Sequence, residues 1–463
     1  MPRNSWFDRL TQLRSGGATD ATPTTGLVLS GGGARASFHI GALRYLYDCV
    51  GIAPSSIVGT SAGSIVSLIL AQSINPGEQA AQLRALEDIW LTMKDSSDMF
   101  AEQAWFTRLR GHADDLTGGL SGLLSTSERE ESMSAVDGDA DDVSETVQRA
   151  MEDDPSQDMT LTPTVIGQLA GSLLKIGRVG SGLAASVRGA ERANSAFRPG
   201  PIVRRLLFES GFQAAKVASS GVALRLAFVD LNTGALRFMR QDGVIVDRDD
   251  RPIDDTSYDL TLGVWASCAI PGVFRPVKMG DGVYVDGGVR ENVPVEMAVT
   301  HLGATRPYVI VASPPGLAHE DFTSKDIVSV LLRSGVIMFN EAIQDEVEWA
   351  RSAGACVIEP LTNVHDAGTV HPLLLRINRD YGWTRAAEEL TTAPPSLREV
   401  DESIVKARCD LAADIRRGDA TEEKLGVHRR KITRLLRRAD PTLLPPSYET
   451  WADEVMPPGV SLP

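Results

Sequence analysis

The spacing of hydrophobic positions from residue 25 onward predicts strands and helices in alternation. Two short apolar runs, "GLVLS" at 26–30 and "SSIVG" at 55–59, have the length of buried strands. Each is followed by a segment with helical spacing, "SFHIGALRYLYD" at 37–48 and "SAGSIVSLILA" at 61–71. Strand, helix, strand and helix in this order predict parallel strands joined by right-handed crossovers. We therefore expect an α/β fold.

The same patterns continue further along the chain. A helix is predicted near residues 76–94, and regular structure resumes after a long interruption at "PGPIVRRLLFE". Beyond it, "VALRLAFVDLNTGALRFM" predicts two strands around a turn at Asn232 and Gly234. "GDGVYVDGG" predicts a short strand between glycine turns, and "RPYVIVAS" predicts another strand. Long helices are expected at 324–351 and, with a basic end, at about 395–440.

Two segments interrupt this pattern. Residues 1–24 resemble an appendage, in which apolar and arginine residues at helical spacing allow either an interfacial helix or one docked on its own domain. Residues 98–196 form an insertion of changing charge: 112–154 hold 13 acidic and 2 basic side chains, whereas 165–205 hold 7 basic and 1 acidic. The acidic part is typical of a mobile segment. The basic, glycine-rich part is compatible with a lid or with loose packing over the domain.

Composition excludes several classes of function. The net charge of −15 argues against a general nucleic-acid binder. The four cysteines are scattered without CxxC spacing, so neither a zinc site nor a disulfide framework is expected, and a reducing, cytoplasmic compartment fits. The first residues lack the apolar core of a signal peptide, and no apolar run reaches the ~18 residues of a membrane-spanning helix.

One motif points to nucleophilic chemistry. "IVGTSAG" places Ser61 in G-x-S-x-G between a strand and an apolar helix, which is the context that this motif requires. A serine on such a sharp turn projects its hydroxyl outward, and Gly59 and Gly63 keep side chains out of the bend. The helix that follows directs its positive end at the site. Ser61 is therefore the candidate nucleophile.

The base that would accept the Ser61 proton is less evident. Seven histidines are present, none in a recognisable triad context, and His39 on the first helix reads as a structural residue. A carboxylate is the alternative. Asp286 in "YVDGG" stands at a strand end beside two glycines, whereas its rival Asp281 in "GDGV" reads as a turn residue.

The run "SGGGARA" raises a separate question, because glycines between a strand and a helix bring backbone amides close to an anion. The anion could be a nucleotide phosphate or a carbonyl oxygen that becomes negative. A phosphate-binding P-loop requires G-x-x-x-x-G-K-[ST], and no such lysine follows here.

Taken together, "GGGARA", "GTSAG" and "DGG" resemble the patatin-like phospholipase family. "FVDLNTG", "WASCAIPGVFRPV" and "DGGVRENVPV" extend the resemblance, which covers about residues 25–95 and 197–315, and more loosely to about 390. Two positions depart from the family's pattern: Ser30 stands where many members have aspartate, and Ala36 stands where glycine is frequent. Both residues are small, so the turn should survive.

The resemblance implies a role for each matching residue. Ser61 and Asp286 would form a Ser–Asp dyad that works without histidine. The amides of Gly31, Gly32 and Gly33 would form the oxyanion hole, and preorganised donors of this kind are worth roughly 3–4 kcal/mol each. Supporting roles fall to the arginine after the glycines and to the glycines beside the dyad: Arg35, Gly59, Gly63, Gly287 and Gly288.

The resemblance also implies an architecture. We expect a three-layer patatin-like fold whose mainly parallel central sheet is flanked by helices. An N-terminal appendage (1–24) would precede a catalytic domain (25–390). The domain would contain the helical or disordered insertion (98–196), with a lid and loose packing over the domain as its two alternative roles, and a helical extension (391–463) would follow.

The expected function is hydrolysis of lipid acyl esters, of phospholipase A or lysophospholipase type. The substrate would be a membrane phospholipid or another acyl lipid, reached by peripheral contact with a membrane, with no metal or cofactor and no nucleic acid. Acyl transfer to an alcohol or cleavage of neutral glycerides with the same dyad is one alternative. A catalytically silent lipid-binding regulator is the other.

Overall fold

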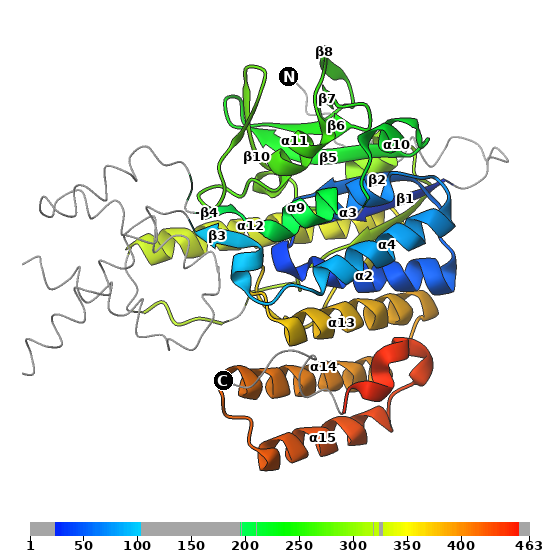
Figure 1. Cartoon of the computed structure of the whole chain (residues 1–463), viewed down its shortest axis with the longest axis vertical. Coiled ribbons are helices and arrows are strands. Elements are labelled where there is room, and N and C mark those ends of the chain that lie inside the picture. The colour runs from blue at the N-terminus through cyan, green and yellow to red at the C-terminus, as the bar shows by residue number, and fades with distance from the viewer. Residues whose placement is uncertain are drawn as a thin grey trace, which may run out of the picture.

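The computed structural model describes residues 24–102, 195, 197–209, 211–317, 319–323 and 327–452, and Figure 1 shows their arrangement. The predicted appendage except Thr24, most of the predicted insertion and the last residues of the chain lie outside this described part.

A ten-stranded sheet forms the centre of the described chain, with β1 and β2 in its middle. Its order is β12-β11-β1-β2-β5-β6-β7-β8, and β10 pairs with both β5 and β9. The strands are β1 (Thr25–Leu29), β2 (Pro54–Thr60), β5 (Ala223–Asp230), β6 (Ala235–Arg240), β7 (Val244–Val246), β8 (Pro252–Ser257), β9 (Val277–Met279), β10 (Gly282–Asp286), β11 (Arg306–Ile310) and β12 (Cys356–Ile358).

Strands β12, β11, β1, β2 and β5 run parallel, whereas β6 to β10 add antiparallel pairs. The helices are α2 (Ala36–Tyr45), α3 (Ala62–Leu70), α4 (Pro76–Trp90), α9 (Pro201–Phe208), α10 (Ala214–Ser219), α11 (Leu260–Ser267), α12 (Ile327–Ser352), α13 (Pro372–Thr391), α14 (Pro395–Arg416) and α15 (Glu422–Leu436). The predicted α/β class, with helices flanking a mainly parallel centre, is confirmed.

Alternation along β1 shows why the sheet is covered on both faces. Leu27 and Leu29 belong to a large core with side chains of α2, α3, α4 and α13. Val28 lies between them and belongs to a second core, which includes Ile343 and Val347 of α12. Successive strand residues point to opposite faces, so an apolar run buried on both sides gives three layers: helices, sheet and helices.

The two ends of the long insertion are held together. Strand β3 (Phe100–Glu102) pairs antiparallel with β4 (Phe197–Pro199) as a separate two-stranded sheet. The ring of Phe100 stacks on that of Phe274 with 5.5 Å between centroids, which attaches this sheet to the segment between α11 and β9. The insertion therefore leaves and rejoins the described chain at one place.

Helices α13, α14 and α15 lie in succession below the sheet and its first helical layer (Figure 1). Helix α13 has extensive contact with α2, α14 packs on α13, and α15 packs on α14. Apolar side chains of all three belong to the same core as Leu27. None of the helices in the described part of the chain is long and apolar enough to cross a membrane.

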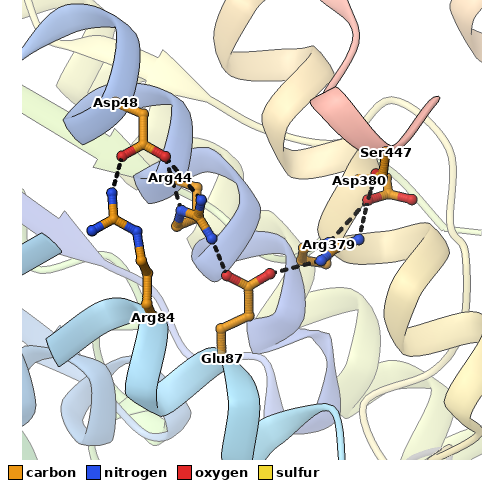
Figure 2. Close-up of polar contacts among 7 residues, drawn as sticks. All are labelled: Arg44, Asp48, Arg84, Glu87, Arg379, Asp380 and Ser447. Carbon is orange, nitrogen blue, oxygen red and sulfur yellow. Dashed lines mark hydrogen bonds and ion pairs between the residues drawn. The ribbon is translucent and has the colours of Figure 1, made fainter. Parts of the chain in front are cut away.

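A buried network of charges joins these layers (Figure 2). Glu87 of α4 pairs with Arg44 of α2 at 2.5 Å and with Arg379 of α13 at 2.7 Å. The adjacent Asp380 pairs with Arg379 at 2.6 Å and with Arg408 of α14 at 2.9 Å. The Ser447 hydroxyl, from the turn η8 (Pro446–Thr450), donates to Asp380 at 3.3 Å.

Loss of the Asp380 carboxylate should therefore destabilise the fold strongly. Asp380→Ala leaves two arginine partners, one of them fully buried, and breaking a buried pair in this way costs about 3–5 kcal/mol. Asp249→Ala is the control, because it removes an exposed pair with Arg251 worth at most about 1 kcal/mol. The free energy of unfolding, measured in urea, distinguishes the two variants. Equal losses in both would contradict the role given to this network.

Candidate active site

Ser61 lies on a sharp turn between β2 and α3. Its backbone has φ 53° and ψ −128°, a positive φ that costs a residue with a side chain about 1–3 kcal/mol. The hydrogen bond from the Ser61 amide to Ser267 Oγ, at 2.9 Å, helps to hold this conformation. A strained serine at the end of a central strand is the geometry of a nucleophile elbow.

The two glycines of G-x-S-x-G allow the elbow to pack. A Cβ at Gly59 would lie 2.3 Å from Ser67 Oγ, and one at Gly63 would lie 2.5 Å from the carbonyl oxygens of both Leu29 and Ser30. The start of α3 therefore touches the end of β1. That contact places the Ser61 turn directly beside the glycine loop that follows β1.

Asp286 reaches the same place from the other side. It ends β10, which pairs antiparallel with β5, the neighbour of β2. The Asp286 carboxylate accepts the Gly288 amide at 2.8 Å. Burial raises the pKa of Asp286 to about 6, although interaction with the Ser61 side chain and the bond from Gly288 oppose the rise. Both residues of the candidate dyad are buried.

The glycine loop is shaped by tight packing. A Cβ on Gly32 would lie 2.5 Å from Ala312 Cβ, and one on Gly33 would lie 2.4 Å from the Ala367 carbonyl oxygen. Gly33 also has φ 55°, in the left-handed region that favours glycine. Glycine is therefore needed at both positions, for space at Gly32 and for space and backbone conformation at Gly33.

The three amides of this loop are used differently. Gly31 donates its N–H to Asn292 Oδ1 at 2.7 Å. Among the described residues, no acceptor lies at the amides of Gly32 and Gly33, which precede the first turn of α2. Amides at the start of a helix have no partner within the helix and attract negative charge. Within the described part of the chain, Gly31 therefore has a hydrogen-bond acceptor for its amide, whereas none is found for Gly32 and Gly33.

Arg35 holds the loop from outside. Its Nε donates to the His365 carbonyl at 2.9 Å, and its Nη1 donates to Ser313 Oγ at 2.8 Å. Asp366 lies 3.7 Å away as an ion partner. The same 365–367 segment accepts the Ala34 amide at Ala367. Arg35 thus anchors the glycine loop to the segment before α13.

The two departures from the family pattern fit without strain. The Ser30 hydroxyl donates to the Gly31 carbonyl at 2.9 Å and accepts the Ala312 amide at 2.9 Å, which joins the ends of β1 and β11. Ala36 is fully buried at the start of α2. His39 meets Ser30 through Nε2 at 3.4 Å, and burial lowers the pKa of His39 to about 3. A neutral His39 in contact with Ser30 agrees with the interpretation of this histidine as a structural residue.

Sequence reasoning missed Ser267, Asn292 and the 365–367 segment as parts of the site. Ser267 and Asn292 stand within the stretches "WASCAIPG" and "DGGVRENVPV", which carried the resemblance but assigned these two residues no role. Nothing in the local pattern of 365–367 marks it as a support for the glycine loop. Its role follows from a contact across the fold.

Comparison with known proteins identifies the family of the chain. The model of the family described as Patatin-like phospholipase matches residues 27–299, more than half of the chain. The chain belongs to the patatin-like phospholipase family. The predicted family is confirmed, and the matched region contains both residues of the candidate dyad.

Individual relatives are distant. A patatin-like phospholipase domain-containing protein of Caenorhabditis elegans, ZK370.4, is 34% identical over 111 residues, which is 23% of this chain and 7% of that protein. The crystal structure of VipD from Legionella pneumophila aligns with a TM-score of 0.32 and 13% identity, over 94% of this chain and 80% of that one. The structure of the ExoU–SpcU complex of the type III secretion system of Pseudomonas aeruginosa aligns with a TM-score of 0.22 and 17% identity, over 93% of this chain and 69% of that one.

A cavity of about 400 Å³ lies between the loop after β10 and α12; neither Ser61 nor Asp286 is among its lining residues. Gly288 and Asn292, which contact Asp286 and Gly31, form one wall. The opposite wall comes from α12, where Met338, Phe339, Ala342 and Ile343 are apolar and Glu346 adds a carboxyl group. Met338 is 73% exposed, so this wall continues to the protein surface.

The raised pKa predicts a gain in stability when Asp286 loses its charge. The native pKa of Asp286, about 6, exceeds its ordinary value of 3.8, so the fold favours the protonated carboxyl. This contribution to the free energy of unfolding is complete below about pH 3.8 and is lost as pH rises through about 6. Relative to wild type, Asp286→Asn should therefore gain stability between pH 4 and pH 7, by about 3 kcal/mol for a rise of this size. Urea unfolding at several pH values measures it. Asp281→Asn, in the exposed turn before β10, is the control, and a gain independent of pH would contradict the assignment.

Proposed function

We propose that this chain is a lipid acyl hydrolase of phospholipase A or lysophospholipase type that uses a Ser61–Asp286 dyad. The observation that carries the proposal is a serine on a strained strand-to-helix turn whose side chain interacts with a buried carboxyl, Asp286, and burial raises the pKa of that carboxyl to about 6. A serine hydroxyl becomes a nucleophile when a neighbouring base takes its proton. Asp286 is ionised at neutral pH and is a stronger base than an ordinary carboxylate.

The proposed reaction proceeds in two steps. Asp286 accepts the Ser61 proton while Ser61 Oγ attacks the ester carbonyl, and the amides of Gly32 and Gly33 stabilise the negative oxygen of the tetrahedral intermediate. The proton passes to the leaving alcohol, and an acyl-enzyme remains. A water molecule then gives a proton to Asp286 and attacks the acyl carbonyl, and this proton passes to Ser61 Oγ as the ester bond to the enzyme breaks and the fatty acid leaves. Gly31 supports the loop in this scheme through its bond to Asn292.

The cavity between the loop after β10 and α12 supports a lipid as the substrate. The apolar side chains of its α12 wall suit a hydrocarbon chain, which gains about 0.8 kcal/mol for each buried methylene group. Large apolar side chains at its edge are exposed, with Met338 at 73% and Val289 at 53%. Apolar groups at the mouth of a site suit contact with a lipid surface. We propose that this edge meets the membrane.

Removal of either dyad residue should abolish the activity. Ser61→Ala removes the nucleophile, and Asp286→Asn removes the base, which costs roughly 10²–10⁴-fold in kcat. The measurement is mass spectrometry of products released from mixed phospholipid liposomes, with labelling of Ser61 by a fluorophosphonate. Asp281→Asn is the matched control and should keep wild-type activity. Full activity in Ser61→Ala or Asp286→Asn would exclude the dyad.

The same product analysis separates the alternatives. Free fatty acid indicates hydrolysis, whereas acyl groups found on an added alcohol indicate transfer. Release from triglyceride emulsions but not from phospholipid indicates a neutral-glyceride lipase. A wild-type protein that binds liposomes, releases nothing and resists the fluorophosphonate would be a silent lipid-binding regulator.

The cavity gives a second prediction, on chain length. Ala342→Trp should fill part of it and raise KM for long-chain esters by about ten-fold, the cost of excluding two methylene groups, while short-chain esters are unaffected. Comparison of butyryl with palmitoyl esters measures this selectivity. Glu341→Trp is the control, because that position is exposed on the same helix outside the lining. An unchanged ratio in Ala342→Trp would place the acyl chain elsewhere.

A further inference from the structure

Asn292 ties the loop after β10 to the glycine loop. Its side-chain oxygen accepts the Gly31 amide at 2.7 Å, and its backbone oxygen lies 3.3 Å from the same amide. Asn292 is 4% exposed. A Cβ on Gly31 would lie 2.3 Å from Asn292 Oδ1 and 3.2 Å from Ser61 Cβ. Asn292, Gly31 and the nucleophile are therefore packed against one another without free space.

Glu346 of α12 holds Asn292 in turn. Its carboxylate accepts the Asn292 amide at 3.1 Å and the Val293 amide at 2.7 Å. Burial raises the pKa of Glu346 to about 8, and the nearby Glu291 and Asp345 carboxylates add to the rise. A carboxyl group in such a place costs stability that an apolar side chain against the same cavity would not cost. The hydrogen bonds that Glu346 accepts from the Asn292 and Val293 amides offset part of this cost.

We propose that Glu346 is a positioning residue for the oxyanion loop, acting through Asn292 on Gly31. This inference rests on the proposed function for its effect on catalysis, but the contacts themselves do not depend on it. The chain of hydrogen bonds runs from α12 to the 292–293 backbone, through the Asn292 side chain to Gly31, and so to the next amide, Gly32. Helix α12 covers the opposite face of the sheet from α2. A residue of α12, on one face of the sheet, thus positions the backbone amides that precede α2 on the other face.

The rate should depend strongly on Glu346, because catalysis is sensitive to small displacements of the hydrogen-bond donors. A reacting group displaced by about 1 Å can lose roughly 100-fold in rate, and Gly31 has no other side-chain acceptor among the described residues. Without Glu346, the 292–293 amides lose a shared acceptor, and the Asn292 side chain is free to shift toward the cavity that it lines.

The test combines kinetics with hydrogen exchange in the full chain. Glu346→Ala should lower kcat for phospholipid hydrolysis roughly 10- to 100-fold per titrated active site. Glu346→Gln keeps an oxygen acceptor and should recover most of this loss. Amide exchange in the peptide that covers residues 25–36 should be faster in Glu346→Ala. The control is Glu348→Ala, an exposed residue on the same helix, which should behave as wild type.

A double-mutant cycle separates positioning from general support of the fold. If Glu346 acts through Asn292, Glu346→Ala should add little to the loss of kcat already caused by Asn292→Ala. Losses that multiply, or unchanged exchange in 25–36, would overturn the inference. A wild-type chain without hydrolysis and without fluorophosphonate labelling would instead refute the proposed function. In that case the exchange measurement alone decides whether Glu346 holds the loop.

Discussion

The close approach of two backbone segments, the start of α3 against the end of β1, is the constraint on which the site depends. A Cβ at Gly63 would fall 2.5 Å from two carbonyl oxygens of β1 and the residue after it, so only glycine permits the contact. Because β1 and β2 are parallel neighbours, their carboxyl ends lie side by side. The loop after one strand then supplies amides, and the turn after the other supplies the serine. A site at the carboxyl ends of adjacent parallel strands is the general solution of open α/β sheets.

Around this contact, the protein accepts local costs. Ser61 has a positive φ, Asp286 is a buried carboxyl with a raised pKa, and Glu346 is another. Each is unfavourable by itself, and each is held by hydrogen bonds to neighbours that cannot move independently. Two apolar cores on the two faces of the sheet supply the stability that offsets these costs. These unfavourable positions lie close to the carboxyl ends of the central strands, where the proposed chemistry takes place.

The C-terminal helices are joined to the rest of the fold by ion pairs as well as by apolar packing. Asp380 joins α13 to α14 through Arg408. Figure 2 shows its link to η8 through Ser447 and the links of Glu87 from α4 to α2 and α13. Helix α13 begins just after the segment that anchors Arg35 and packs along α2, whose first turn follows the glycine loop. The elements beyond residue 390 therefore support the helical layer that follows the glycine loop.

The sequence by itself determined the alternation of strands and helices around the site, the family and the residues of the candidate dyad, but it did not predict β7, β8, α11, β12 or α13. The apolar runs, the G-x-S-x-G elbow and the D-G-G turn are local patterns, and local backbone sterics are sufficient to interpret them. It could not reveal that Gly31 donates to Asn292, that Glu346 holds Asn292, or that residues 365–367 support the glycine loop. These contacts join residues that are far apart in the chain. Only the packing of α12 and α13 on opposite faces of one sheet decided them, because hydrogen-bond partners and burial depend on which surfaces meet.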